Sequence, residues 1–412
     1  MKSDPDRIAS RRAWSLVGFM WVAYFLNFSD RQAVYSIFPV LKSELKFSDT
    51  QLGLIGAVFM WVYAICSPIA GQIGDRFSKR ALIILSILLW SGLTTLTGLS
   101  NSVSMFLVLR ALIGVTEALF IPCAVALTAN AHGPETRSRA LAVFATAELA
   151  GVVMGGWYGG FVAQEFHWRM TFYSLGAFGI LYAIPYSLFL KRTREEHQVE
   201  TKKSGGGLAL GALISVPTYR VLCVAFPAFC FVITIIYAWL PYFLYGKFSL
   251  SLAEAGFTAT AYIQGATFVG LLAGGGLADW LYGRTKAARL WVVSTGLFLA
   301  SPCLHLVGNS SSLLLTKVAA VGFGLGSGLC ISNFLASSFE VVPSDTRASA
   351  VGFSNLVTCF VSGLAALLAG VWKESVGINN LMSYSALGCA ATGLLLILGI
   401  KLCFRRDYDR VH

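Results

Sequence analysis

Continuous apolar segments of about 20 residues alternate with short polar segments along nearly the whole chain. A segment of that length is long enough for a helix to cross the hydrocarbon core of a bilayer. The strands of a membrane barrel would instead alternate apolar and polar residues. The pattern therefore predicts an all-α membrane protein with twelve transmembrane helices. We expect them near residues 14–38, 51–74, 80–98, 104–128, 138–163, 168–190, 219–245, 253–280, 286–307, 311–338, 347–372 and 378–403.

The longest polar segment separates the sixth predicted helix from the seventh, and it is rich in Lys, Arg, Glu and Gly. Such a composition is typical of a flexible, solvated linker. We therefore expect three parts: an N-terminal six-helix bundle over residues 1–190, a cytoplasmic linker loop over 191–218, and a C-terminal six-helix bundle over 219–412.

Composition and charge agree with a membrane protein. Of the 412 residues, 56% are hydrophobic and 12% are charged, whereas soluble domains have about 25% charged residues. A net charge of +11 would suggest a nucleic-acid partner for a soluble protein. Here, placing both termini in the cytoplasm puts 23 of the 31 Lys and Arg residues inside and five in outer loops. That asymmetry predicts cytoplasmic termini in a plasma or inner membrane, and no nucleic-acid partner.

The two halves of the chain repeat short motifs. Gly71 and Asp75 are followed by Arg80, and 204 residues later a glycine precedes Asp279 and Arg284 with the same spacing. Two further markers recur at offsets of 207 and 210: Arg110 with Cys123 as Lys317 with Cys330, and Glu135-Thr136-Arg137 as Asp345-Thr346-Arg347. These repeated motifs indicate a duplicated six-helix unit. In transporters with parallel repeats of this kind, the substrate site lies at the membrane midplane between the two repeats.

The segment from Gly71 to Arg80 resembles the loop between helices 2 and 3 of the major facilitator superfamily, with Ser78 where that family usually has Gly. The resemblance extends over essentially the whole chain and implies transport by alternating access. Charge pairs and helix dipoles in such a loop can hold the cytoplasmic side closed. The residues that we expect to act in gating are Gly71, Asp75, Arg76, Arg80, Asp279 and Arg284.

Ionisable residues at membrane depth are the strongest functional signal. Each costs about 2.5–3.5 kcal/mol and must face a partner or a wet cavity. They are Asp30, Arg31, Arg110, Glu117, Glu148 and Lys317. Asn27, Asp30 and Arg31 share one face of the first helix. Arg110 and Glu117 are seven residues apart, about 10.5 Å along one face of the fourth helix.

An arginine forks two hydrogen bonds to a carboxylate or phosphate, so Arg110 is a candidate anion-binding residue, assisted by Arg31 and Asn27. Asp30, Glu117 and Glu148 are candidate proton carriers, because a bound anion that competes for an arginine changes a carboxylate's affinity for protons. A permanent ion-pair network between the first and fourth helices is the alternative. Glu148 could likewise form a settled pair with one of the arginines.

The charges on these two helices resemble those of two branches of the family, the spinster-like lysolipid transporters and the organic-anion symporters for sugar acids. Leu119 stands where the symporters usually have Pro, which favours the spinster-like branch slightly. The resemblance implies proton-coupled transport of an amphipathic or organic anion such as a lysophospholipid. Symport of a sugar acid is the alternative, and a non-transporting receptor or scaffold is a third hypothesis from another class.

The second half offers few charges but many aromatic and amide side chains. The candidate substrate contacts of this half are therefore Tyr237, Gln264, Asn333 and Asn355.

The nine cysteines show no spacing suited to a metal. We expect neither cofactor nor metal, no enzyme activity, and a monomer. Protons are the expected coupling ion, and sodium remains an alternative. The glycine-rich segment from Gly151 to Gly160 predicts close helix packing.

Overall fold

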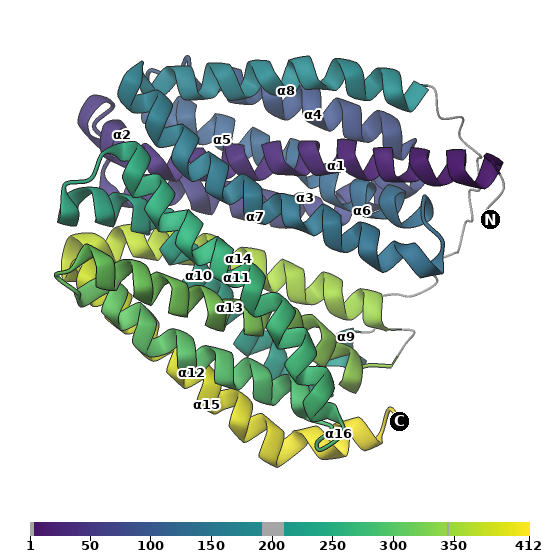
Figure 1. Cartoon of the computed structure of the whole chain (residues 1–412). Coiled ribbons are helices and arrows are strands. Elements are labelled where there is room, and N and C mark those ends of the chain that lie inside the picture. The colour runs from purple at the N-terminus through teal and green to yellow at the C-terminus, as the bar shows by residue number, and fades with distance from the viewer. Residues whose placement is uncertain (1–3, 192–209, 344–345) are drawn as a thin grey trace. The chain divides into compact units, whose positions relative to one another are not determined.

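The computed structural model describes residues 4–191, 210–343 and 346–412, and these residues are almost entirely helical (Figure 1). The helices of the first half are α1 (Asp4–Ser36), α2 (Phe38–Glu44), α3 (Asp49–Arg76), α4 (Lys79–Thr97), α5 (Val103–Ala118), α6 (Phe120–Asn130), α7 (Pro134–Glu165) and α8 (Trp168–Lys191). Those of the second half are α9 (Leu210–Ile214), α10 (Pro217–Phe248), α11 (Leu252–Tyr282), α12 (Ala288–Asn309), α13 (Leu313–Val341), α14 (Arg347–Val376), α15 (Ile378–Gly399) and, after a π-helical turn, α16 (Arg405–Asp409).

All twelve predicted segments fall on helices, which confirms the all-α prediction. Within the described residues, eleven helices are long and apolar enough to cross a membrane. The remaining predicted segment is α1, which is long enough but lacks a sufficiently apolar stretch. Its polar residues are among those singled out above for their chemistry.

Prolines explain two interruptions that divide single predicted helices. The first predicted helix breaks at Ile37 and the fourth breaks at Leu119. A proline lacks an N–H and its ring clashes with the carbonyl group four residues earlier. Pro39 and Pro122 each follow a break by two or three residues. The second break, at Leu119, lies two residues after Glu117.

The chain divides into two compact units. Unit 1 comprises α1–α8 together with Leu244–Phe257, and unit 2 comprises the other described residues from α9 onward. Most of the predicted linker, residues 192–209, lies outside the described residues. The boundaries of the three predicted parts therefore remain a prediction.

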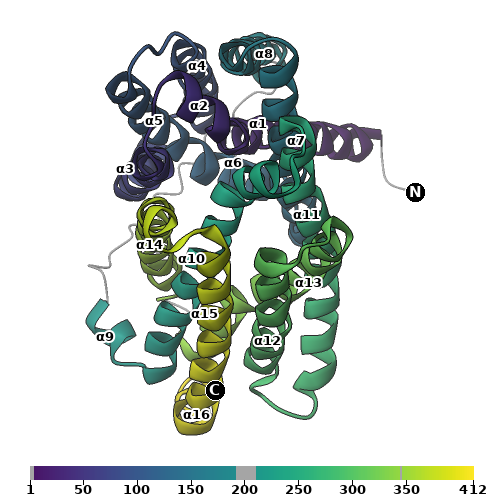
Figure 2. The same ribbon diagram turned by 90° about the vertical axis from the view of Figure 1, so that its left-hand side faces the viewer.

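In unit 1, α1 and α7 lie side by side (Figures 1 and 2) and touch through a row of glycines. Gly151, Gly155 and Gly159 face Phe25, Ser29 and Ala33, all at a spacing of four residues. A Cβ atom on Gly155 would lie only 2.3 Å from the carbonyl oxygen of Ser29. The predicted close packing of this segment is confirmed. The contact holds α1 against α7 and so determines the orientation of the α1 face that bears the charges.

The duplicated arginines at the start of α7 and α14 make equivalent contacts. Arg137 donates a hydrogen bond from Nε to the carbonyl oxygen of Ala129 at 3.1 Å. Arg347 donates one from Nη2 to the carbonyl oxygen of Phe339 at 3.0 Å. In both units the arginine thus caps a carbonyl group eight residues earlier. The sequence repeat therefore reflects a repeated structural role.

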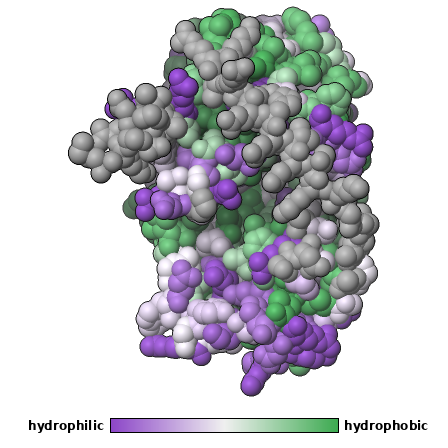
Figure 3. All heavy atoms as spheres, turned by 90° about the vertical axis from the view of Figure 1, so that its right-hand side faces the viewer, coloured by the Kyte–Doolittle hydropathy of each residue, from purple (hydrophilic) through white to green (hydrophobic). Residues whose placement is uncertain are grey.

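In unit 2, α12 packs against both α13 and α15. Asp407 in α16 accepts hydrogen bonds from the backbone N and the Oγ1 of Thr218, both at 2.8 Å, and so caps the start of α10. Hydrophilic residues gather at this end of the unit (Figure 3), where Arg284, Lys286 and Arg405 are exposed. This charged end is the one that the basic-residue count assigns to the cytoplasm.

Candidate functional site

The buried charges of α1 and α5 meet inside unit 1. Arg31 donates a hydrogen bond from Nε to the Oε2 atom of Glu117 at 2.6 Å. The Glu117 side chain is completely buried and that of Arg31 is 12% exposed. Within the described part of the chain, Glu117 Oε1 and Arg31 Nη2 are buried and have no hydrogen-bond partner. The ion pair therefore leaves hydrogen-bonding capacity unused on both sides.

Asp30 lies beside this pair and is also buried. Thr94 of α4 donates a hydrogen bond from Oγ1 to the Oδ2 atom of Asp30. The other carboxylate oxygen, Oδ1, is buried without a partner among the described residues. Sequence reasoning missed Thr94, because a threonine in an apolar helix is common and does not by itself indicate a site.

Arg110 of α5 is 1% exposed, and its Nε and Nη1 atoms have no hydrogen-bond partner in the described regions. Its guanidinium group lies over the ring of Phe59 in α3, 5.1 Å from the ring centroid. Arg31 lies over the same ring at 4.7 Å, and over Phe28 and Tyr63 at 4.9 and 5.0 Å. Two cations thus share one aromatic ring through cation–π contacts. Phe59 was not predicted, because buried aromatic residues are usually core.

Asn27 lies on α1, three residues before Asp30 and four before Arg31. It is fully buried, and neither Oδ1 nor Nδ2 finds a partner within the described residues. Buried polar groups in native proteins are almost always hydrogen-bonded, and a group left without a partner calls for an explanation such as a water or a ligand. Asn27, Asp30 and Arg110 together offer both donors and acceptors. The arrangement is suited to receive a polar, charged ligand.

Glu148 of α7 is hydrogen-bonded to a tyrosine, and it also interacts electrostatically with Arg31, one of the two arginines considered in the sequence analysis. Its Oε2 atom accepts a hydrogen bond from the Tyr24 hydroxyl at 3.0 Å. The Tyr24 ring stacks on Phe144, with ring centroids 4.5 Å apart. This contact joins α1 to α7. Tyr24 positions the carboxylate.

The predicted contacts of the second half are distributed over four helices of unit 2. Gln264 is 3% exposed and its Oε1 atom has no partner among the described residues. Asn333 donates from Nδ2 to the carbonyl oxygen of Gly274 at 3.1 Å, which ties α13 to α11. Tyr237 is half-buried and Asn355 is exposed. Their role as substrate contacts stays a prediction.

The first copy of the predicted gating motif spans the end of α3 and the start of α4. Asp75 and Arg76 are exposed, and Gly71 and Arg80 are half-buried. A Cβ atom on the intervening Gly74 would lie 3.1 Å from the Sγ atom of Cys123. The glycine therefore lets α3 approach α6 closely.

In the second copy of the motif, Asp279 and Arg284 contact different partners. Arg284 lies over the Trp280 ring at 4.3 Å, while Asp279 lies 3.7 Å from Nη2 of Arg289. Arg289 also donates from Nε to Oε1 of Glu340 at 2.9 Å. Arg289 therefore bridges α11 and α13. Sequence reasoning missed this arginine and Glu340; the only signal was an acidic residue near the end of an apolar helix.

The family model described as "Major Facilitator Superfamily" matches residues 20–366. The chain belongs to the major facilitator superfamily. A solved structure of a bacterial homologue of the human lysosomal transporter Spinster, inward-facing and unoccupied, superimposes with a TM-score of 0.78. It covers 100% of this chain and 99% of its own, at 20% identity, and shows the shared fold.

The relatives of this chain differ in what they transport. An MFS-type efflux pump of Mycolicibacterium smegmatis is 28% identical, covering 96% of this chain and 92% of its own. A hexuronate transporter of Bacillus subtilis is 25% identical over 74% of this chain and 73% of its own. The sphingosine-1-phosphate transporter SPNS2 of Xenopus tropicalis is 23% identical over 100% and 86%. The chain is thus an integral membrane transporter of the superfamily and not an enzyme.

Proposed function

We propose that this superfamily member is a proton-coupled secondary transporter that moves an amphipathic organic anion, such as a lysophospholipid, by alternating access. The observation that carries the proposal is Arg110. It is buried, and it keeps two N–H donors without a partner among the described residues. A buried cation is costly unless an anion compensates it with hydrogen bonds. A carboxylate or phosphate bound across Nε and Nη1 would supply both.

The carboxylates nearby support proton coupling. Arg110 interacts electrostatically with both Asp30 and Glu117. When a substrate anion binds Arg110, these carboxylates share their compensating cation with a further negative charge. Protonation of one carboxylate relieves that repulsion, so a proton is bound together with the anion. Binding of both on the same side, and release on the other, constitutes symport.

The amphipathic character of the substrate is supported by the aromatic rings around the two arginines. Phe28, Phe59 and Tyr63 surround Arg31, and Phe59 also contacts Arg110. Such surroundings suit a ligand whose charged head is joined to an apolar part. The relative that transports sphingosine-1-phosphate, an amphipathic phosphate, aligns with 100% of this chain and 86% of its own length.

A sugar acid is the second candidate substrate, and Asn27 favours it. Its amide is buried with neither polar atom bonded within the described residues. A polyhydroxylated ligand could donate to Oδ1 and accept from Nδ2 while its carboxylate binds Arg110. The hexuronate transporter among the relatives has a substrate of this class.

The proposal also assigns gating to the charged residues at the helix ends. We place both termini in the cytoplasm, and the two motif copies at the cytoplasmic ends of their units. Asp279 and Glu340 flank Arg289 there, and the exposed Asp75 and Arg76 occupy the corresponding end of α3. Charge pairs of this kind stabilise one arrangement of helix ends and are released in another.

The direct test uses the full chain in liposomes that contain a pH-sensitive dye. Lysophosphatidic acid, or separately glucuronate, is added outside, and substrate-dependent proton movement is recorded. We expect a signal with lysophosphatidic acid, and a signal with glucuronate alone would select the second candidate. Asp30→Asn should abolish the signal, while Asp409→Asn, an exposed site in α16, should not. A signal that requires sodium, or one that Asp30→Asn leaves unchanged, would overturn the proton coupling.

A further inference from the structure

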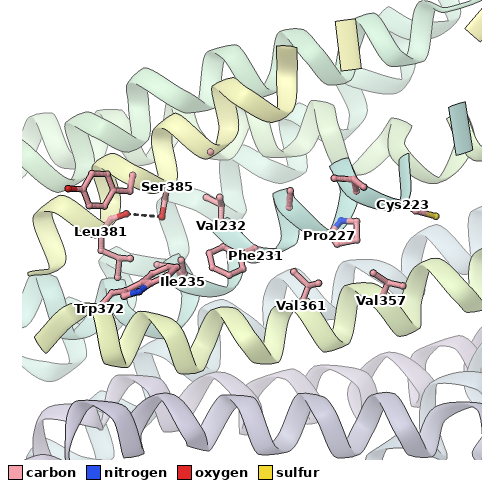
Figure 4. Close-up of a pocket in the computed structure, with 14 residues that line it drawn as sticks. Cys223, Pro227, Phe231, Val232, Ile235, Val357, Val361, Trp372, Leu381 and Ser385 are labelled. Atoms are coloured by element: carbon pink, nitrogen blue, oxygen red, sulfur yellow. Dashed lines mark hydrogen bonds between the residues drawn. The ribbon is translucent and has the colours of Figure 1, made fainter. Parts of the chain in front are cut away.

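Unit 2 contains an apolar pocket of about 610 Å³ between α10, α14 and α15 (Figure 4). This volume is within the range of about 300–1,000 Å³ that is common for ligand sites. Figure 4 shows the lining side chains spread along the helices, from Cys223 and Val357 at one end to Trp372 and Leu381 at the other. The pocket is therefore an elongated groove that follows the helix axes.

The repeat of the two halves explains how the groove arises. At the offset of 210 residues, Val361 of α14 corresponds to Gly151 of α7. Gly151 contacts α1 so closely that a Cβ atom would lie 2.6 Å from the Phe25 carbonyl oxygen. In unit 2 the corresponding valine carries a side chain and lines the pocket instead. Pro227 within α10 also lines it, and a proline there removes a helical hydrogen bond.

The groove has the length of one leaflet of a bilayer. On α10 its lining runs from Cys223 to Ile235, twelve residues or about 18 Å of helix. The hydrocarbon core of a membrane is about 30 Å thick, so one acyl chain occupies about 15 Å of it. Val224 and Tyr384 line the groove and are each 58% exposed. The groove is therefore open along part of its length.

Two polar side chains bear on how a lipid would lie here, Ser385 within the groove and Arg220 beyond one end of it. Within the groove, the Ser385 hydroxyl donates to the carbonyl oxygen of Leu381 at 2.8 Å, so the lining behaves as apolar. Arg220 lies one helical turn before Val224, on the same face of α10, and is exposed. A lipid chain in the groove would therefore bring its phosphate to a guanidinium group at the charged end of the unit.

We propose that this groove binds one acyl chain of an anionic phospholipid from the surrounding bilayer, with the lipid phosphate held by Arg220. The groove consists of residues of unit 2 alone, and the Arg110 cluster consists of residues of unit 1 alone. The proposal requires only that the chain lies in a membrane, and it stands or falls independently of the transported substrate. The bound lipid is a resident partner, not cargo.

The first test is native mass spectrometry of the full chain, purified with equal amounts of phosphatidylglycerol and phosphatidylcholine. We expect the wild-type protein to retain phosphatidylglycerol preferentially. Gly388→Phe should reduce bound lipid about tenfold, because the new ring fills the groove. A Cβ atom at Gly388 has only Val232 nearby, at 3.9 Å, so the backbone accepts the change. Arg220→Gln should lower the preference for phosphatidylglycerol about fivefold.

Gly352→Phe is the matched control, because Gly352 of α14 is exposed, does not line the groove, and has nothing within 4 Å of an added Cβ. It should bind lipid as the wild type does. Equal retention of both lipids by the wild type, or unchanged binding by Gly388→Phe, would overturn the proposal.

The second test needs no variant. Phosphatidylglycerol with a photoreactive acyl chain is incorporated into vesicles with the wild-type chain, and labelled peptides are identified. We expect labels between residues 223 and 235 and between 357 and 372. Labels that avoid both segments would overturn the groove as the site.

Discussion

At the residue scale, the buried ion pair of Arg31 and Glu117 belongs to the candidate site and also contributes to the stability of the fold. Glu117 is the residue that compensates the Arg31 charge at 2.6 Å, and it is entirely buried. Removing one member of a buried ion pair leaves the other charge uncompensated, which usually costs about 3–5 kcal/mol. The stability of the protein therefore depends on this pair.

We expect Glu117→Gln to lower the free energy of unfolding by about 3 kcal/mol, because Arg31 then keeps its charge but loses the carboxylate that is hydrogen-bonded to it. Thermal unfolding in detergent, followed by tryptophan fluorescence, measures the effect. The double variant Arg31→Gln/Glu117→Gln should be markedly more stable than the single variant. If the single variant is as stable as the wild type, the pair is not the compensating contact described here.

Sequence reasoning found the charged residues but not their surroundings. Asp30, Arg31, Arg110 and Glu117 stand out because an apolar helix rarely contains them. Phe59 and Thr94 contact these residues directly, yet aromatic and threonine side chains are common in such helices. The spacing of Arg110 and Glu117 was correct as a statement about one face of a helix. An ion pair between the first and fourth predicted helices was one of the alternatives, and the structure shows that Arg31 is the partner of Glu117.

At the element scale, the row of glycines in α7 sets the position of α1. Gly151, Gly155 and Gly159 let the two helix backbones touch. Small residues at such a spacing are typical of helix contacts in membranes. The glycines were readable in the sequence as a packing surface. Their partner was not, because the glycine spacing does not specify which helix it faces.

We expect Gly155→Ala to destabilise the protein, since its Cβ would lie 2.3 Å from the Ser29 carbonyl oxygen and force α1 away from α7. Gly18→Ala in α1 is the control, because nothing lies within 4 Å of an added Cβ there. Alanine is the better helix former by about 1 kcal/mol, so the control should be as stable as the wild type or more so. Melting temperatures in detergent decide the matter. Equal temperatures for both variants would rule out the close contact.

At the scale of the whole molecule, the duplication made the fold predictable. Twelve apolar segments and three markers at nearly one offset imply two related six-helix units. Differences between the halves were harder to foresee. Unit 1 contains the buried charged cluster, and unit 2 has an apolar groove where Val361 replaces a glycine. Single replacements within a repeat change packing without changing hydropathy, so a hydropathy pattern does not detect them.

The central claim, that Arg110 binds the anionic group of the substrate, is tested most directly by equilibrium binding of lysophosphatidic acid to the purified full chain. Removing one partner of a buried charge pair costs about 2–5 kcal/mol, which corresponds to a loss of affinity of about 30-fold or more. We expect Arg110→Gln to show that loss, and Arg110→Lys an intermediate one, because lysine keeps the charge but not the fork. Arg410→Gln, at an exposed position, should bind as the wild type does. Wild-type affinity in Arg110→Gln would contradict the claim.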